Sequence, residues 1–129
     1  MRLLAVLFFI ILASCCHGQL PAKIRLATIF PVDSITKIRV SNFTGTHSLS
    51  ENELAKLKAL LKNAVIVGLT AKPGHITLEI TLTENCLANP GFTYVTSSGL
   101  HFENAKDRLG QPFQGTVILP EIINFDNYR

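Results

Sequence analysis

Cysteine and histidine are the side chains of this 129-residue chain that would support nucleophilic or metal chemistry, because thiolates and imidazoles are good nucleophiles and good metal ligands. The chain has three cysteines and four histidines. Beyond the N-terminal segment these are Cys86, His47, His75 and His101, and they do not stand at the spacings of a metal site. The sequence has no glycine-rich phosphate loop, no CxxC and no HExxH. It therefore predicts no catalytic residue, no metal and no cofactor.

The N-terminus has the pattern of an export signal. Arg2 is followed by eleven residues without a polar group, Leu3 to Ala13. Eleven helical residues span roughly 16 Å, about half the hydrocarbon core of a bilayer, so this run is too short to cross a membrane. A positive start, a short apolar core and small residues after it predict a secretory signal that is removed on export.

The end of this apolar run, Leu12-Ala13-Ser14-Cys15, resembles the lipobox of bacterial lipoproteins: an aliphatic residue, two small residues and a cysteine. The resemblance implies that the signal peptide, residues 1–14, is cut before Cys15 and that the Cys15 thiol is joined to diacylglycerol. It implies a lipoprotein of the cell envelope. The residue after Cys15 is not Asp, which favours the outer membrane.

Ordinary signal cleavage after Gly18 is the alternative, and it would give a secreted soluble protein. A eukaryotic chain would be processed in this way. Asn42-Phe43-Thr44 has the pattern of an N-glycosylation site and points in the same direction.

The charge distribution bears on the partners of the chain. From Cys15 to Lys72 there are eight Lys/Arg and three Asp/Glu, and from Pro73 to Arg129 there are three and six. The basic half is the one tethered to the predicted lipid, so its cations either face anionic head groups or form the solvated side of strands. Nucleic acid is not expected as a partner, because the chain is exported and its basic residues do not interleave with stacking aromatics.

The domain organisation follows from proline positions and hydrophobic periodicity. Residues 15–33 are expected to form a tether that Pro21 and Pro31 interrupt, and residues 34–129 a single domain. Ser50 to Glu53 has the pattern of a capping box at the start of a helix. The apolar face of this helix comprises Leu54, Leu57, Leu61, Ala64 and Val65.

Strands are predicted where apolar and polar residues alternate. The clearest alternation runs from His75 to Glu84, with Ile76, Leu78, Ile80 and Leu82 on one face. His101 is expected to face outward if its two neighbours face the core. The other strands are expected over residues 34–43, 92–96, 100–103 and 113–119, with a polar loop at 104–112 and a docked tail at 122–128.

These elements predict an α+β fold: an antiparallel β-sheet of four to six strands packed on one amphipathic helix, in the order β-α-β-β-β-β. This order is similar to that of the cystatins, which wrap a sheet around one helix and inhibit cysteine proteases. The resemblance covers topology alone. Gln114 to Ile118 does not match the QxVxG hairpin of that family, and the chain has no tryptophan for its second loop.

The leading functional hypothesis is an exported, lipid-anchored envelope protein that acts as a non-enzymatic binding or accessory module for another envelope protein or a ligand. The alternative is an inhibitor of a secreted enzyme, and a small hydrolase or thiol enzyme that pairs Cys86 with a histidine is the third. Lys72 and His75 are the candidate contact residues, because the turn that holds them combines a cation, a rigid backbone and a titratable ring. A plain connector is the other interpretation of this turn.

Overall fold

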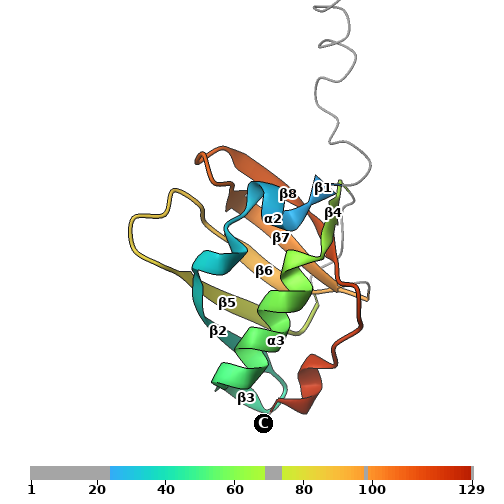
Figure 1. Ribbon diagram of the computed structural model, residues 1–129. Coiled ribbons are helices and arrows are strands. Elements are labelled where there is room, and N and C mark those ends of the chain that lie inside the picture. Colours follow the sequence, from blue (N-terminus) through green and yellow to red (C-terminus); the bar gives the residue numbers. More distant parts are fainter. Residues whose placement is uncertain (1–23, 69–73, 98, 129) are drawn as a thin grey trace, which may run out of the picture.

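The computed structural model describes residues 24–68, 74–97 and 99–128 (Figure 1). Within these residues the dominant feature is one antiparallel sheet of eight strands in the order β1-β4-β8-β7-β6-β5-β2-β3. The strands are β1 (Ile24–Arg25), β2 (Ile35–Asn42), β3 (Gly45–Ser48), β4 (Val65–Val67), β5 (Thr77–Leu82), β6 (Phe92–Val95), β7 (Gly99–Lys106) and β8 (Pro112–Ile118).

The protein is mainly β, and the prediction of an α+β domain with four to six strands on one helix, ordered β-α-β-β-β-β, is wrong. Its described residues hold eight strands and only two short α-helices, α2 (Leu26–Ile29) and α3 (Glu51–Lys62). The missed strands carry no alternating pattern. β3 reads Gly-Thr-His-Ser, and β4 follows α3 so closely that its apolar residues extended the helical pattern.

Helix α3 begins with the predicted capping box. The Ser50 hydroxyl accepts a hydrogen bond from the Glu53 N–H at 3.2 Å, and the Glu53 carboxylate accepts one from the Ser50 N–H at 2.9 Å. Together these bonds satisfy two backbone donors near the helix start. Leu57 and Leu61 are fully buried, which confirms the inner face of the helix. The helix ends at Lys62, and Val65 belongs to β4 instead of the helical face.

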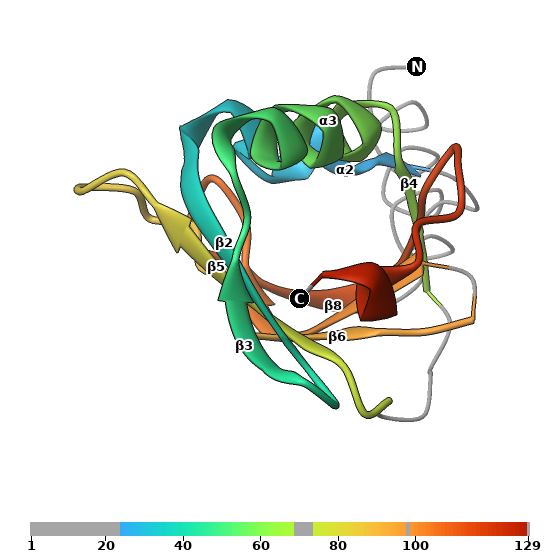
Figure 2. The same cartoon turned by 90° about the horizontal axis from the view of Figure 1, so that it is seen from below.

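The sheet curves around α3, which lies across its concave side together with α2 (Figure 2). Register shifts in the β2–β5 and β7–β8 pairs add to this curvature, because a bulge bends the strand that carries it. The concave side and the helices enclose one apolar core. Its fully buried members include Leu26, Phe30, Ile38, Val40, Leu57, Leu61, Leu100, Phe102 and Val117.

The N-terminal part of the described chain is built into this core. Leu26, Phe30 and Val32 lie within residues 24–33, which were expected to belong to the tether, and Val32 begins the 3₁₀ turn η1 (Val32–Ser34). Leu26 and Phe30 are fully buried. The ordered domain therefore begins by Ile24, about ten residues earlier than the expected boundary at 34.

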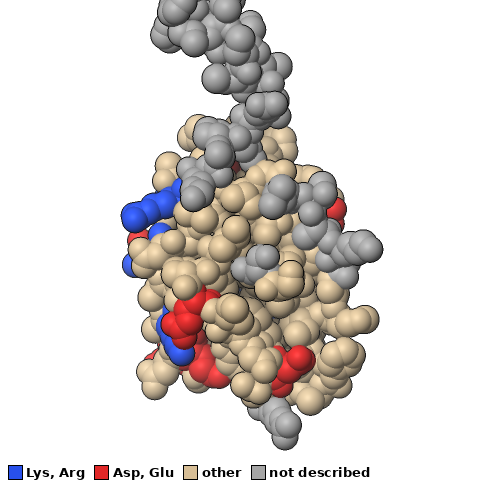
Figure 3. Space-filling model, turned by 90° about the vertical axis from the view of Figure 1, so that its right-hand side faces the viewer, with Lys and Arg blue, Asp and Glu red and all other residues tan. Residues whose placement is uncertain are grey.

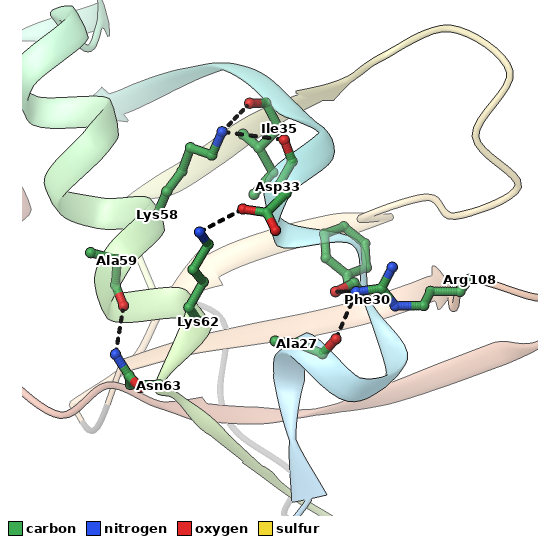
Figure 4. Close-up of polar contacts among 9 residues, drawn as sticks. All are labelled: Ala27, Phe30, Asp33, Ile35, Lys58, Ala59, Lys62, Asn63 and Arg108. Carbon is green, nitrogen blue, oxygen red and sulfur yellow. Dashed lines mark hydrogen bonds and ion pairs between the residues drawn. The ribbon is translucent and has the colours of Figure 1, made fainter.

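Basic residues of α3 and of the loop between β7 and β8 hold this N-terminal segment (Figure 4). Arg108 donates from its guanidinium to the carbonyl oxygen of Ala27 at 2.7 Å and from its main-chain N–H to that of Ile29 at 2.8 Å. Lys58 donates to the Ile35 carbonyl at 3.0 Å, and Lys62 pairs with the carboxylate of Asp33 at 2.6 Å. These contacts fix a segment that has little regular secondary structure.

The C-terminal segment docks as predicted, through a 3₁₀ turn, η2 (Phe125–Asn127). Phe125 is buried against the core. Charged side chains are few on the face that carries β4 and this segment (Figure 3). None of the helices in the described residues is long and apolar enough to span a membrane.

Candidate functional site: a groove beside strand β5

The two edges of β5 differ in how they are paired. One edge pairs with β2 along the whole strand, from Thr77 opposite Ser41 to Leu82 opposite Ile35. The other edge pairs with β6 at Thr77 and Leu78 only. From Glu79 to Leu82, β5 therefore has no strand beside it on the β6 side among the described residues.

The main-chain groups of Ile80 and Leu82 point toward this open side. The Ile76 carbonyl accepts a hydrogen bond from the Val95 N–H, whereas the Thr83 N–H donates to Ser34, on the β2 side. In an antiparallel ladder successive residues direct their N–H and C=O groups to opposite edges. Even-numbered residues of β5 thus face β6, and Ile80 and Leu82 have no backbone partner there in the described part of the chain.

The chain between β5 and β6 is drawn away from β5 by contacts with β7. Asn89 exchanges two main-chain hydrogen bonds with Lys106, at 2.9 and 2.7 Å, and so forms an isolated bridge to the end of β7. The Asn89 side chain then accepts from the Gly91 N–H at 2.7 Å. Gly91 has a φ of 61°, a left-handed conformation that favours glycine. This bend fixes residues 88–92 as a wall that stands apart from β5.

A groove of about 560 Å³ lies between β5 and this wall. Its volume is within the range of roughly 300–1,000 Å³ that is typical of ligand sites. The Phe92 side chain, which is 50% exposed, stands on the wall side, and Glu79 lies on the β5 side. The lining mixes hydroxyl, apolar and main-chain groups; it includes Ser41, Thr77, Glu79, Thr81, Pro90 and Phe92.

The charge in the groove is a single, weakly paired carboxylate. Glu79 lies 3.7 Å from the Arg39 guanidinium, and the side chains are 67% and 42% exposed. A long ion pair at that exposure contributes little free energy, so Glu79 is available to a ligand. Glu103 stands opposite Phe92 in the β6–β7 register and adds a second carboxylate on the same face of the sheet.

The candidate contact residues from the sequence lie only partly within the described chain. Lys72 and Cys15 lie outside the described residues. His75 is exposed, and its ring centroid lies 5.4 Å from that of Phe43. His75 comes two residues before Thr77, which begins β5 and lines the groove. The exposed pair of rings therefore lies beside the start of β5.

The cysteine and histidine side chains of the described residues each contact a different hydroxyl or aromatic group. Cys86 contacts the Thr83 hydroxyl at 3.5 Å, and His47 contacts the Thr44 hydroxyl at 2.7 Å. His101 contacts the Thr116 hydroxyl at 3.2 Å. No group of three or more His, Cys, Asp or Glu side chains that could hold a metal occurs in the described residues.

His101 lies on the face of the sheet opposite Leu100 and Phe102, as the alternation predicts, yet it is buried. Its exposed fraction is only 2%, and its ring centroid lies 5.0 Å from that of Tyr94. Burial lowers the pKa of His101 below its usual value, while the nearby Glu103 carboxylate raises it by a smaller amount. Neutral imidazole is therefore the favoured form in the folded protein.

Two other surface hollows are weaker candidates. A groove of about 460 Å³ between α3 and residues 33–36 contains Lys58 and Lys62, which already bond to Asp33 and Ile35. The Lys62 ammonium lowers the pKa of the Asp33 carboxyl through their hydrogen bond and charge. On the face with few charges, the hollow beside the exposed Ile122 measures only about 20 Å³.

Comparison with known proteins gives no match: no family model, no curated protein and no solved structure is significantly similar to this chain.

Proposed function

We propose that this protein is an exported, lipid-anchored protein of the cell envelope that acts as a non-enzymatic binding module. Its site is the groove beside β5. The observation that carries this proposal is the stretch of β5 at Ile80 and Leu82, which has no backbone partner on the β6 side among the described residues and borders the groove of about 560 Å³. An open strand edge next to a cavity is a place where another molecule can complete the hydrogen bonding of the sheet.

The anchoring part of the proposal rests on the N-terminal sequence. Leu12 to Cys15 matches the lipobox pattern at the end of a short apolar run. Nine residue steps separate Cys15 from Ile24, where the described domain begins, and nine extended residues reach roughly 30 Å. A lipid at Cys15 would therefore hold the domain within about this distance of the bilayer surface.

A binding role is supported over the enzymatic alternative by the surroundings of Cys86. Its sulfur contacts Thr83, and each described histidine contacts a different partner, so Cys86 forms no thiolate–imidazole pair with a histidine of the described residues. The inhibitor alternative relied on one strand before the main helix. Among the described residues three strands precede α3, and β4, which follows it, pairs with β1 and not with β2 or β3, so the topology no longer supports that alternative.

Site-specific photocrosslinking in native membranes tests the binding role. A photoreactive amino acid replaces Thr81 in the groove, or Ile122 on the face with few charges, as the matched control. We expect a discrete crosslinked adduct from position 81 only, and its yield should fall in a Phe92→Ala background. Equal adducts from positions 81 and 122 would remove the groove as the binding site.

The anchor has a separate test. Mass spectrometry of the mature protein should show an N-terminal Cys15 that carries diacylglycerol. An unmodified mature chain that starts at Gln19 would contradict the lipid anchor while leaving the groove hypothesis in place.

A further inference from the structure

We infer that the groove beside β5 takes an extended peptide segment as an added strand, and that this segment carries a Lys or Arg side chain that lies against Phe92 and Glu79. The inference rests on the proposed binding role and names the kind of partner. It follows from three properties of the groove: its main-chain groups, its side-chain charges and its length.

The main-chain groups match a polypeptide. Ile80 and Leu82 each offer one N–H donor and one C=O acceptor to the open side. Two residues of a strand span roughly 6.5–7 Å, which is also the repeat at which a second strand presents its own donors and acceptors. An extended segment therefore satisfies both residues at once. Proteins use this mode, in which a peptide completes an open sheet edge, to recognise extended segments.

The side-chain environment selects a cation. Residues of an added strand would alternate between the core side, with Ile80, and the outer side, between Glu79 and Phe92. On the outer side a Lys or Arg would meet the Glu79 carboxylate and the half-exposed Phe92 ring, with Glu103 beyond it. A carboxylate and an aromatic face both attract a cation. An acidic residue at the same position would face both carboxylates.

The groove also limits the length of the contact. Among the described residues the strand edge has no partner from Glu79 to Leu82, and Leu82 and Ala88, at the two ends of the connection between β5 and the wall, both line the groove. At about 3.3 Å per residue, four residues of β5 accompany about four residues of the added segment. The recognised motif is consequently short, with a cation at an outward position and apolar or hydroxyl side chains on either side.

Selection of peptides on the purified mature protein tests the inference. The probe is a display library of random dodecapeptides, and the strongest binder is then synthesised for affinity measurements. We expect enriched sequences to share one Lys or Arg within an alternating segment. Methylating the amide nitrogens on one edge of that segment should abolish binding, whereas methylating the other edge should leave it. An enrichment without Lys or Arg, or no enrichment at all, would overturn the inference.

Variants of the protein locate the contact. Ile80→Pro and Ile80→Ala both lose the isoleucine side chain, but only proline also removes the N–H that faces the groove. The affinity of Ile80→Pro for the peptide should therefore be about tenfold lower than that of Ile80→Ala. Glu79→Lys should weaken it by a similar factor, and Glu84→Lys, an exposed control beyond the groove, should not. If Ile80→Pro does not fold, the comparison of Glu79→Lys with Glu84→Lys tests the inference by itself. Equal affinities for the two Ile80 variants, together with equal affinities for Glu79→Lys and Glu84→Lys, would refute strand addition. A crosslink from position 81 without any enrichment of peptides would overturn this inference alone and leave the proposed binding role in place.

Discussion

The side-chain nitrogen of Asn42 lies 2.8 Å from the main-chain oxygen of Tyr128 and donates a hydrogen bond to it across 86 positions of the chain. The same nitrogen donates to the Phe125 carbonyl at 3.0 Å, so both of its hydrogens are used. The side-chain oxygen of Asn42 accepts hydrogen bonds from the N–H and the hydroxyl of Thr44. Attachment of a glycan would remove one of these hydrogens, so we expect Asn42 to be unmodified in the folded protein despite its sequon.

Replacing Asn42 with alanine should release the C-terminal segment. The change removes two hydrogen bonds and leaves two carbonyl oxygens without their donor, at a cost of about 1–3 kcal/mol in the free energy of unfolding. Hydrogen exchange of residues 124–128 should accelerate by more than that of the sheet. Asn127→Ala, an exposed change in the same turn, serves as the control. Equal exchange in wild type and Asn42→Ala would show that Phe125 alone holds the segment.

Leu57→Ala measures how much α3 contributes to the core. Leu57 is fully buried, and the cavity left by the missing atoms should lower the free energy of unfolding by about 2–5 kcal/mol. Denaturant unfolding checks this value. Ala55→Ser, on the exposed side of the helix, should change stability by less than about 0.5 kcal/mol. A loss for Leu57→Ala as small as that of the surface change would mean that the inner face of α3 is misassigned.

Gly91→Ala should disturb the wall of the groove. A Cβ at this position would lie 2.2 Å from the Glu103 carbonyl oxygen and 2.6 Å from that of Asn104, so the backbone has to move. Gly45→Ala is the matched control, because Gly45 also has a positive φ but nothing lies within 4 Å of its added Cβ. We expect Gly45→Ala to cost about 1–2 kcal/mol from backbone strain and Gly91→Ala clearly more. Comparable melting temperatures for the two variants would contradict the close packing of the wall.

The buried His101 predicts a pH dependence of stability. The pKa of His101 in the folded protein lies below the ordinary value of 6.5. Well above pH 6.5 the ring is therefore neutral in the folded and the unfolded protein, and it does not make the free energy of unfolding depend on pH. As the pH falls through 6.5 the unfolded chain takes up the proton more readily, and stability decreases until the pH lies below the folded pKa. His101→Gln should flatten this decline as the pH falls below 6.5, and denaturant unfolding over a series of pH values measures it. An unchanged decline in His101→Gln would assign it to other groups.

The sequence was sufficient for the elements that carry a local signal. The capping box at Ser50 and the strict alternation along β5 both specify their structure within a few residues, and both are confirmed. β3 and β4 have no such signal, because a polar four-residue edge and three apolar residues after a helix become strands only through their partners.

The groove could not be predicted from the sequence, because it too depends on contacts between residues that are distant in the chain. Asn89-Pro90-Gly91 is recognisable as a turn, but its separation from β5 depends on the bridge between Asn89 and Lys106. His101 is similar: alternation placed it on the correct face of the sheet, and its burial depends on long-range packing.

The attachment of the N-terminal segment has a mechanical consequence. A pull on the chain from before Ile24 would load β1 first, and β1 is joined to β4 through only two residue pairs. The next restraints are the buried Leu26, whose N–H donates to the Ala64 carbonyl, and the Arg108 bonds to Ala27 and Ile29, all of which come before the first long strand, β2. Ten residues released from this segment would lengthen the connection by roughly 35 Å while the rest of the sheet stayed closed. The segment would thus yield under tension before the groove is deformed.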